Sequence, residues 1–197
     1  MCGDSLVVFG TNKVYALHLS NVQSGWRLVT QSDVVRQQPV SGFVNGDYCV
    51  WGGFSPKRAD ALASLSMDGL CFHHDETSSL AGPVYPLTSE SVFLGGAAAV
   101  NIDSYTLVVM GGVNKDVFLN ALNNPVADYL TWQSDRYKFN DKMFAYDSQG
   151  WKFIGENRQL KRAGATLVVY RGQLYLIGGE LKPGIRTPSV CRITWIK

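Results

Sequence analysis

"ATLVVYRGQLYLIGG", residues 165–179, contains two apolar runs separated by a polar turn, and it ends on a pair of glycines. The same order occurs in "GFVNGDYCVWGG" (42–53) and "AAVNIDSYTLVVMGG" (98–112), while "SLVVFG" (5–10) keeps only the second run and one glycine. Short runs rich in Val, Tyr and Phe between turn residues are typical of β-strands. The recurrence therefore predicts an all-β repeat protein.

A further predicted strand follows each glycine stop, and two of these run on into a strand that begins Gly-Trp. The segments are "KVYALHL" (13–19), "ALASLSMDGLCFH" (61–73), "KMFAYDS" (142–148), "SVCRITWI" (189–196), "GWRLV" (25–29) and "GWKFIGE" (150–156). A four-strand unit with Gly-Gly after its second strand and tryptophan in its fourth is typical of a kelch β-propeller blade. A β-sandwich also uses many short strands, but the regular position of the glycine pairs favours the propeller. One helix is expected, within "DVFLNALNN" (116–124).

The repeats predict about four blades, two complete and two partial. The first unit lacks its innermost strand and the last lacks a fourth strand, as a cut through blade edges would leave them. We therefore expect residues 1–197 to form a single kelch propeller domain, either a compact four-bladed ring or part of a larger one. Blade sheets are buried only where they have neighbours on both sides.

The composition is that of a chain able to bury a core. Of its 197 residues 46% are hydrophobic and 17% are charged, unlike a disordered chain. A formal net charge of +2 argues against a nucleic-acid binder. The apolar runs are far shorter than the roughly 20 residues of a membrane helix. No signal peptide is expected, because residues 1–4 lead directly into a strand.

The cysteines and histidines give no metal or redox motif. Cys2, Cys49, Cys71 and Cys191 lack zinc-ribbon or redox spacing. Cys49 and Cys191 lie in apolar strands and are expected to be buried free thiols. His73 and His74 have no other ligand nearby in sequence, so we predict no metal site.

Charged residues follow the glycine stops, which a propeller gathers on one face around its axis. The segments are "FSPKR" (54–58), "VNKD" (113–116) and "ELKPGIR" (180–186), in which five cations oppose Glu180 and Asp116. A mouth lined by cations attracts small anions, and an arginine fork suits a carboxylate. The turn at 183–184 can return Arg186 to the cavity that Glu180 faces. The alternative is that these charges are solvated loop residues.

Several motifs carry a resemblance to a known family. "MGGVNKDVFLNALNNP", "YKFNDKMFAYD", "YCVWGGFSP", "LGGAAAV" and above all "LIGGELKPGIRTPSV" resemble the bacterial N-acetylneuraminate epimerases, or sialic acid mutarotases, and within them a cyclically permuted branch. The resemblance implies an isomerase that interconverts sialic acid anomers without a cofactor, and it suggests a periplasmic location. It also implies a six-bladed kelch propeller, so about two blades are expected to be missing at the N-terminus.

The resemblance assigns the catalytic pair to Glu180 and Arg186. Ring opening needs a proton taken from the anomeric hydroxyl and one given to the ring oxygen, which a single carboxyl group can do. Arg186, helped by Arg58, is expected to hold the carboxylate of a small sugar acid. Asn114 and Lys182 are further substrate-binding candidates.

Three aromatic residues in the segment 113–141, Tyr129, Trp132 and Tyr137, either offer flat faces to a sugar or pack this segment onto the propeller. The sugar itself stays open between sialic acid, a related sugar acid and a neutral aldose. Two alternatives to a mutarotase stay open as well. One is a non-catalytic kelch module that binds a glycan or a protein, and the other is an inactive fragment. An incomplete ring is expected to self-associate through its uncovered blade faces.

Overall fold

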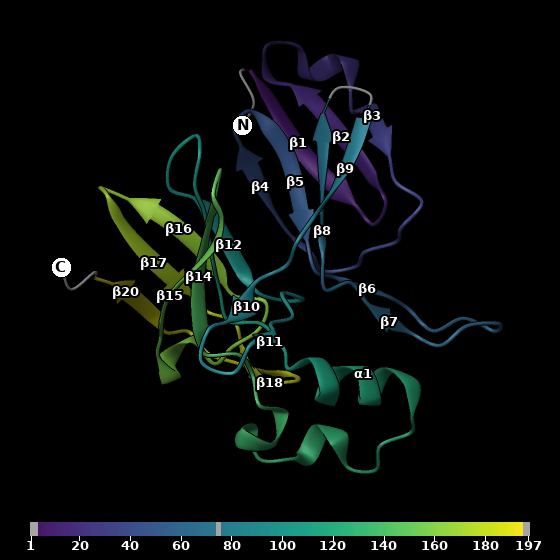
Figure 1. Ribbon diagram of the computed structural model, residues 1–197, viewed down its shortest axis with the longest axis vertical. Helices are drawn as coiled ribbons and strands as arrows, with labels where there is room; N and C mark the ends of the chain where they lie inside the picture. Colours follow the sequence, from purple (N-terminus) through teal and green to yellow (C-terminus); the bar gives the residue numbers. More distant parts are fainter. Residues whose placement is uncertain (1–3, 74–75, 195–197) are drawn as a thin grey trace.

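The computed structural model describes residues 4–73 and 76–194 and shows a chain built of antiparallel sheets (Figure 1). Within these residues there are two four-stranded and two three-stranded sheets, numbered 1 to 4 here in chain order. Each sheet is formed by strands that follow one another along the chain. The fold class is the predicted one, a kelch-type β-propeller, while the number of blades in the assembled family fold stays a prediction.

The strand bounds match most of the predicted segments. Sheet 1 contains β1 (Ser5–Gly10), β2 (Lys13–His18) and β3 (Arg27–Gln31). Sheet 2 contains β4 (Val40–Val44), β5 (Asp47–Trp51), β8 (Gly69–His73) and β9 (Glu76–Leu80). Sheet 3 contains β12 (Ala98–Asn101), β13 (Leu107–Met110), β14 (Lys142–Asp147) and β15 (Gly150–Glu156). Sheet 4 contains β16 (Thr166–Tyr170), β17 (Gln173–Ile177) and β20 (Val190–Ile193).

Short elements lie between these strands. Three two-stranded pairs are β6 (Phe54–Ser55) with β7 (Ser64–Leu65), β10 (Val84–Tyr85) with β11 (Glu90–Ser91), and β18 (Glu180–Lys182) with β19 (Ile185–Arg186). The helices are α1 (Lys115–Asn123) and the 3-10 turns η1 (Leu19–Ser24), η2 (Tyr129–Thr131), η3 (Ser134–Tyr137) and η4 (Arg158–Leu160). The expected helix at 116–124 is thus confirmed. None of the helices among the described residues combines the length and the apolar character that crossing a membrane requires.

Two strand predictions were incomplete in sheet 2. The segment 61–73 was predicted as one strand, but only β8 joins the sheet, while β7 pairs outside it with β6. The strand β9 was not predicted, because its sequence "ETSSL" has no apolar alternation. Its residues are mostly exposed at the outer edge of the sheet, where packing places no demand on side-chain type.

The core is formed by sheets packing face to face. Successive residues of β13 point to opposite sides, so that Leu107 and Val109 join a cluster with sheet 2. Val108 and Met110 join a second cluster with sheet 4. All four side chains are at most 1% exposed. Burial on both faces explains why β5 and β13, the strands that precede the glycine pairs in sheets 2 and 3, contain unbroken apolar runs.

One cysteine prediction was wrong. Cys49 is buried as expected, but it forms a disulfide with Cys71, which lies directly opposite on the neighbouring strand β8. The sequence separation of 22 residues hid this pairing, which only the strand register creates. Cys191 is free but only partly buried. Cys2 and His74 lie outside the described residues.

Two buried arginines hold the glycine stops, and the sequence did not single them out. Arg36 and Arg162 each precede the innermost strand of their sheet by four residues and are 1% and 5% exposed. Arg36 donates to the carbonyls of Gly52 and Asp68 at 3.1 and 3.0 Å and to the carboxylate of Asp68 at 2.9 Å. Arg162 likewise donates to the carbonyl of Gly178 at 3.0 Å. Each guanidinium therefore ties the loop before its sheet to the glycine pair of the same sheet.

Replacing Arg36 by methionine is expected to destabilise the fold by about 3 kcal/mol, because two carbonyls and one carboxylate lose a buried donor. Denaturant unfolding, followed by tryptophan fluorescence, measures the change. The matched control is Arg27→Met on the exposed face of β3, expected within about 0.5 kcal/mol of the parent. Equal losses in the two variants would contradict the role given to Arg36.

Candidate functional site

The loops that precede the innermost strands are joined by backbone hydrogen bonds at one end of the sheets. Gly164 donates its N–H to the carbonyl of Gly96 at 2.8 Å, and Gly96 donates to the carbonyl of Gln38 at 3.1 Å. These three residues hold equivalent positions in sheets 2, 3 and 4, and all have a left-handed backbone. In Figure 1 the same end carries α1, β10, β11 and β18.

A cavity of about 530 Å³ opens beside this line of loops. Gln38, Gly96 and Gly164 form part of its wall, together with segments that follow two of the glycine pairs. Val113 comes from the segment after Gly111–Gly112, and Glu180 from the segment after Gly178–Gly179. The segments that follow the glycine pairs of sheets 3 and 4 therefore lie together at one cavity, as expected. The segment after the pair in sheet 2 does not line this cavity but also meets the segment of sheet 3: Phe54 packs against Phe118 with ring centroids 5.2 Å apart, and Lys57 donates to the carbonyl of Asn123 at 3.1 Å. It then runs outward as β6 and β7 (Figure 1).

Glu180 is positioned by its own backbone. Its N–H donates to the carbonyl of Ala163 at 2.7 Å and its carbonyl accepts from the N–H of Ala163 at 3.0 Å. The preceding Gly179 has φ of 93°, and a Cβ there would lie 2.9 Å from that of Ala165. Only glycine fits this approach, so the glycine pair fixes where the carboxylate enters the cavity.

Arg186 lies across the hairpin from this carboxylate. Residues 180 and 186 are register partners of β18 and β19, and the Arg186 Nε atom lies 3.6 Å from Glu180 Oε1. The Glu180 side chain is 32% exposed, whereas that of Arg186 is 84% exposed. The structure thus brings the two predicted catalytic residues to one cavity, with the acid in the wall and the cation toward solvent. Their catalytic role stays a prediction.

The other three predicted binding residues lie elsewhere. Lys182 donates to the carbonyls of Leu130 and Trp132 at 3.3 and 2.9 Å. Asn114 caps α1, and its side-chain oxygen accepts from two N–H groups of the first turn at 3.1 Å. Arg58 is exposed in the loop between β6 and β7. None of the three is in the wall of the Glu180 cavity, and their role in binding substrate stays a prediction.

The aromatic residues of the 113–141 segment pack mainly against one another. Tyr129 contacts Trp132 and Tyr137 with ring centroids 5.2 Å apart in both pairs. Tyr137 is 1% exposed, and its hydroxyl donates to the carbonyl of Tyr129. The packing interpretation is therefore correct for these rings. Tyr129 in addition lines the cavity, and its burial beside Tyr137 raises the pKa of its hydroxyl.

Sequence reasoning missed the backbone part of this site. Gln38, Gly96, Ala163 and Gly164 contribute through main-chain groups and carry no chemistry in their side chains that a motif search detects. The available signal was their position: Gln38, Gly96 and Gly164 each stand two residues before the innermost strand of a sheet.

Comparison with known proteins identifies the family of this chain. The family profile described as N-acetylneuraminate epimerase matches residues 3–197. The chain belongs to the N-acetylneuraminate epimerase family. Its placement in a permuted branch of this family stays a prediction.

Individual relatives are distant and longer. The N-acetylneuraminate epimerase of Salmonella enteritidis PT4 is 27% identical over 195 residues, which cover 92% of this chain and 50% of the relative. That of Vibrio cholerae serotype O1 is 26% identical over 193 residues, covering 89% and 50%. The solved structure described as "Structure of YjhT" superposes with a TM-score of 0.76 at 21% identity, covering 98% of this chain and 63% of that one. The chain therefore spans about half the length of the epimerases that it matches.

Lys182 is expected to hold the 113–141 segment against the β18–β19 hairpin. Replacing it by methionine removes both hydrogen bonds to residues 130 and 132, so this segment should exchange its amide hydrogens faster. Hydrogen exchange read by mass spectrometry measures the effect. The control Lys152→Met removes an ion pair on the outer strands and should leave exchange in 125–139 unchanged. Unaltered exchange in the Lys182 variant would remove this anchoring role.

Proposed function

We propose that this member of the N-acetylneuraminate epimerase family is a mutarotase, an isomerase that interconverts the anomers of N-acetylneuraminate or a related sugar acid. The observation that carries the proposal is the pairing of Glu180 and Arg186 in one cavity. Family membership and the names of the relatives support the same reaction class.

Glu180 has the features of a general acid and base. The 3.6 Å separation from Arg186 exceeds hydrogen-bond length, so the carboxylate oxygens keep free lone pairs. In the proposed reaction the carboxylate takes the proton of the anomeric hydroxyl, and the resulting acid gives a proton to the ring oxygen as the ring C–O bond breaks. Rotation in the open-chain ketone presents the other carbonyl face. The same two transfers in reverse close the ring as the other anomer.

Arg186 has the features of a carboxylate-binding group. Its side chain is mostly exposed at the cavity and makes one ion pair, at its Nε atom. The two terminal nitrogens therefore remain available for a bidentate contact with the carboxylate of a sugar acid. Binding there holds the sugar within reach of Glu180, which converts a random encounter into an oriented one.

Replacing Glu180 by glutamine is expected to abolish the acceleration of anomer exchange, because the amide cannot accept and return a proton. General acid–base catalysis is worth about 10²–10⁴-fold, so the rate should fall to that of the buffer. Exchange-resolved NMR of N-acetylneuraminate measures it. The control Glu76→Gln, on the exposed strand β9, should keep the parent rate. An unchanged rate in the Glu180 variant would exclude this residue from the mechanism.

Replacing Arg186 by lysine is expected to raise KM for the sugar acid by about tenfold while largely keeping kcat, because the charge remains but the bidentate fork is lost. The assay is the same. A loss confined to kcat would contradict the role of Arg186 in substrate binding.

A further inference from the structure

A second cavity, of about 770 Å³, lies beside the first one, and Val113 and Phe139 belong to the walls of both. Its remaining walls come from the β10–β11 hairpin, the start of α1, the residues around η3, the start of β14 and the residues around η4. Asn114, a predicted substrate-binding residue, lies in this wall, but Glu180 and Arg186 do not. The proposed proton transfers therefore give this cavity no role.

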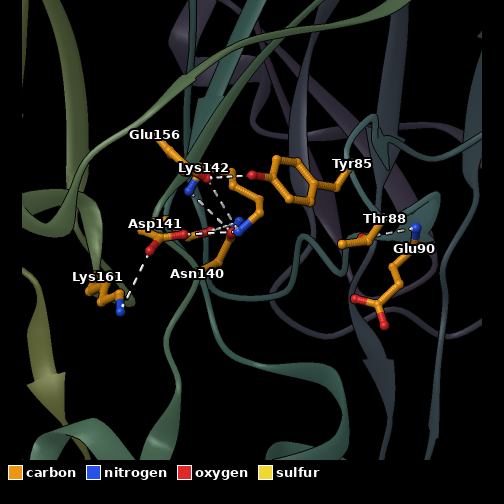
Figure 2. Close-up of polar contacts among 9 residues, drawn as sticks. Tyr85, Thr88, Glu90, Asn140, Asp141, Lys142, Glu156 and Lys161 are labelled. Carbon is orange, nitrogen blue, oxygen red and sulfur yellow. Dashed lines mark hydrogen bonds and ion pairs between the residues drawn. The ribbon is translucent and has the colours of Figure 1, made fainter.

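The centre of one wall is the ammonium of Lys142, whose side chain is 22% exposed. It lies 3.0 Å from the carboxylate of Asp141, 3.8 Å from that of Glu156 and 4.3 Å from the ring centre of Tyr85. The Tyr85 hydroxyl donates to Glu156 at 2.8 Å. Figure 2 shows these groups converging from β10, β14 and β15. The network holds the lysine in a fixed position.

Asp141 is held between two cations. Its second oxygen lies 3.5 Å from the ammonium of Lys161, and its side chain is 26% exposed. Partial burial by itself raises the pKa of Asp141, but the hydrogen bond from Lys142 and the charges of both lysines outweigh it and lower the pKa. The carboxylate is therefore an ionised acceptor at neutral pH. Thr88 and Glu90 of the β10–β11 hairpin also line the cavity (Figure 2).

The charges in the cavity wall are almost balanced. The cations are Lys115, Lys138, Lys142, Arg158 and Lys161, and the acids are Glu90, Asp116, Asp135 and Asp141. Such a wall does not concentrate a field of one sign, so it gives little attraction for an ion. It presents donors and acceptors side by side, and these groups keep hydrogen-bonding capacity beyond their mutual pairs. A ligand whose groups both donate and accept satisfies them best.

We propose that this cavity binds a neutral sugar residue, a hexose or an N-acetylhexosamine, through the fixed side chains of Asp141, Lys142 and Lys161. Each hydroxyl of such a sugar donates to a carboxylate and accepts from an ammonium, so adjacent hydroxyls match the alternation along this wall. The site shares Val113 and Phe139 with the Glu180 cavity but none of its charged residues. It does not depend on the proposed mutarotase activity.

Saturation-transfer NMR with galactose and N-acetylglucosamine tests the proposal. The parent chain is expected to give saturable binding, and both Lys142→Met and Asp141→Asn should weaken it at least about tenfold by removing one half of the wall. Lys152→Met is the matched control, because Lys152 forms a similar ion pair with Asp147 at 2.7 Å on the same two strands but outside the cavity. The Lys152→Met variant should bind both sugars with the affinity of the parent chain. Thermal unfolding of each variant identifies losses that come from misfolding.

Other outcomes would overturn the proposal. No saturable binding of either sugar removes the site. Tighter binding of glucuronate than of galactose, lost in the Lys142 variant, would make it an anion site. Equal weakening by Glu180→Gln would place the sugar in the first cavity. By contrast, loss of anomer exchange in the Glu180→Gln variant with sugar binding intact would support two separate sites.

Discussion

The structure depends on the close approach of backbone to backbone at the glycine pairs that follow the second strands of sheets 2, 3 and 4. In sheet 3 the N–H of Gly112 donates to the carbonyl of Arg162 at 2.9 Å, and a Cβ on Gly111 would lie 2.7 Å from the same oxygen. No side chain fits there, so the strand must end on glycine. The buried guanidiniums of Arg36 and Arg162 bind the carbonyls of Gly52 and Gly178, the first glycines of the pairs in sheets 2 and 4. The backbone contact joins sheet 3 to the loop before sheet 4, while each guanidinium fixes the loop before its own sheet.

The proposed reaction site follows from this constraint. Glu180 is the first residue after a glycine pair, and its backbone is paired with the loop that precedes the same sheet. The carboxylate therefore projects from a backbone held by two hydrogen bonds to Ala163, while Arg186 reaches it from a short hairpin. The neighbouring cavity is built differently, from ion pairs of Lys142 with Asp141 and Glu156 that a hydrogen bond from Tyr85 joins to the β10–β11 hairpin. The two sites differ in their charged groups, because the first carries one glutamate–arginine pair and the second carries five cations and four acids.

Sheets at the two ends of the described chain contrast with those in the middle. The inner sheets bury both faces, whereas Leu6 and Val8 of β1 are 40% and 38% exposed, and Val169 and Tyr170 of β16 are 41% and 57% exposed. The relatives are about twice as long as this chain. Self-association through the end sheets stays a prediction, which has its physical basis in this exposed apolar surface.

The sequence by itself determined the fold class, because apolar runs, turns and glycine pairs report local backbone requirements that recur in every repeat. It also indicated that Glu180 and Arg186 lie across one hairpin, because a tight turn at residues 183–184 brings the two residues close together in space. The disulfide between Cys49 and Cys71, the buried arginines and the loops that form the cavity wall were decided by tertiary structure alone. Lys182 shows the reason most clearly: nothing in its local motif indicated that its ammonium donates to the carbonyls of residues 130 and 132, about 50 positions earlier in the chain. Side-chain partners that are far apart in sequence are chosen by strand register and sheet stacking, and neither is encoded in a local pattern.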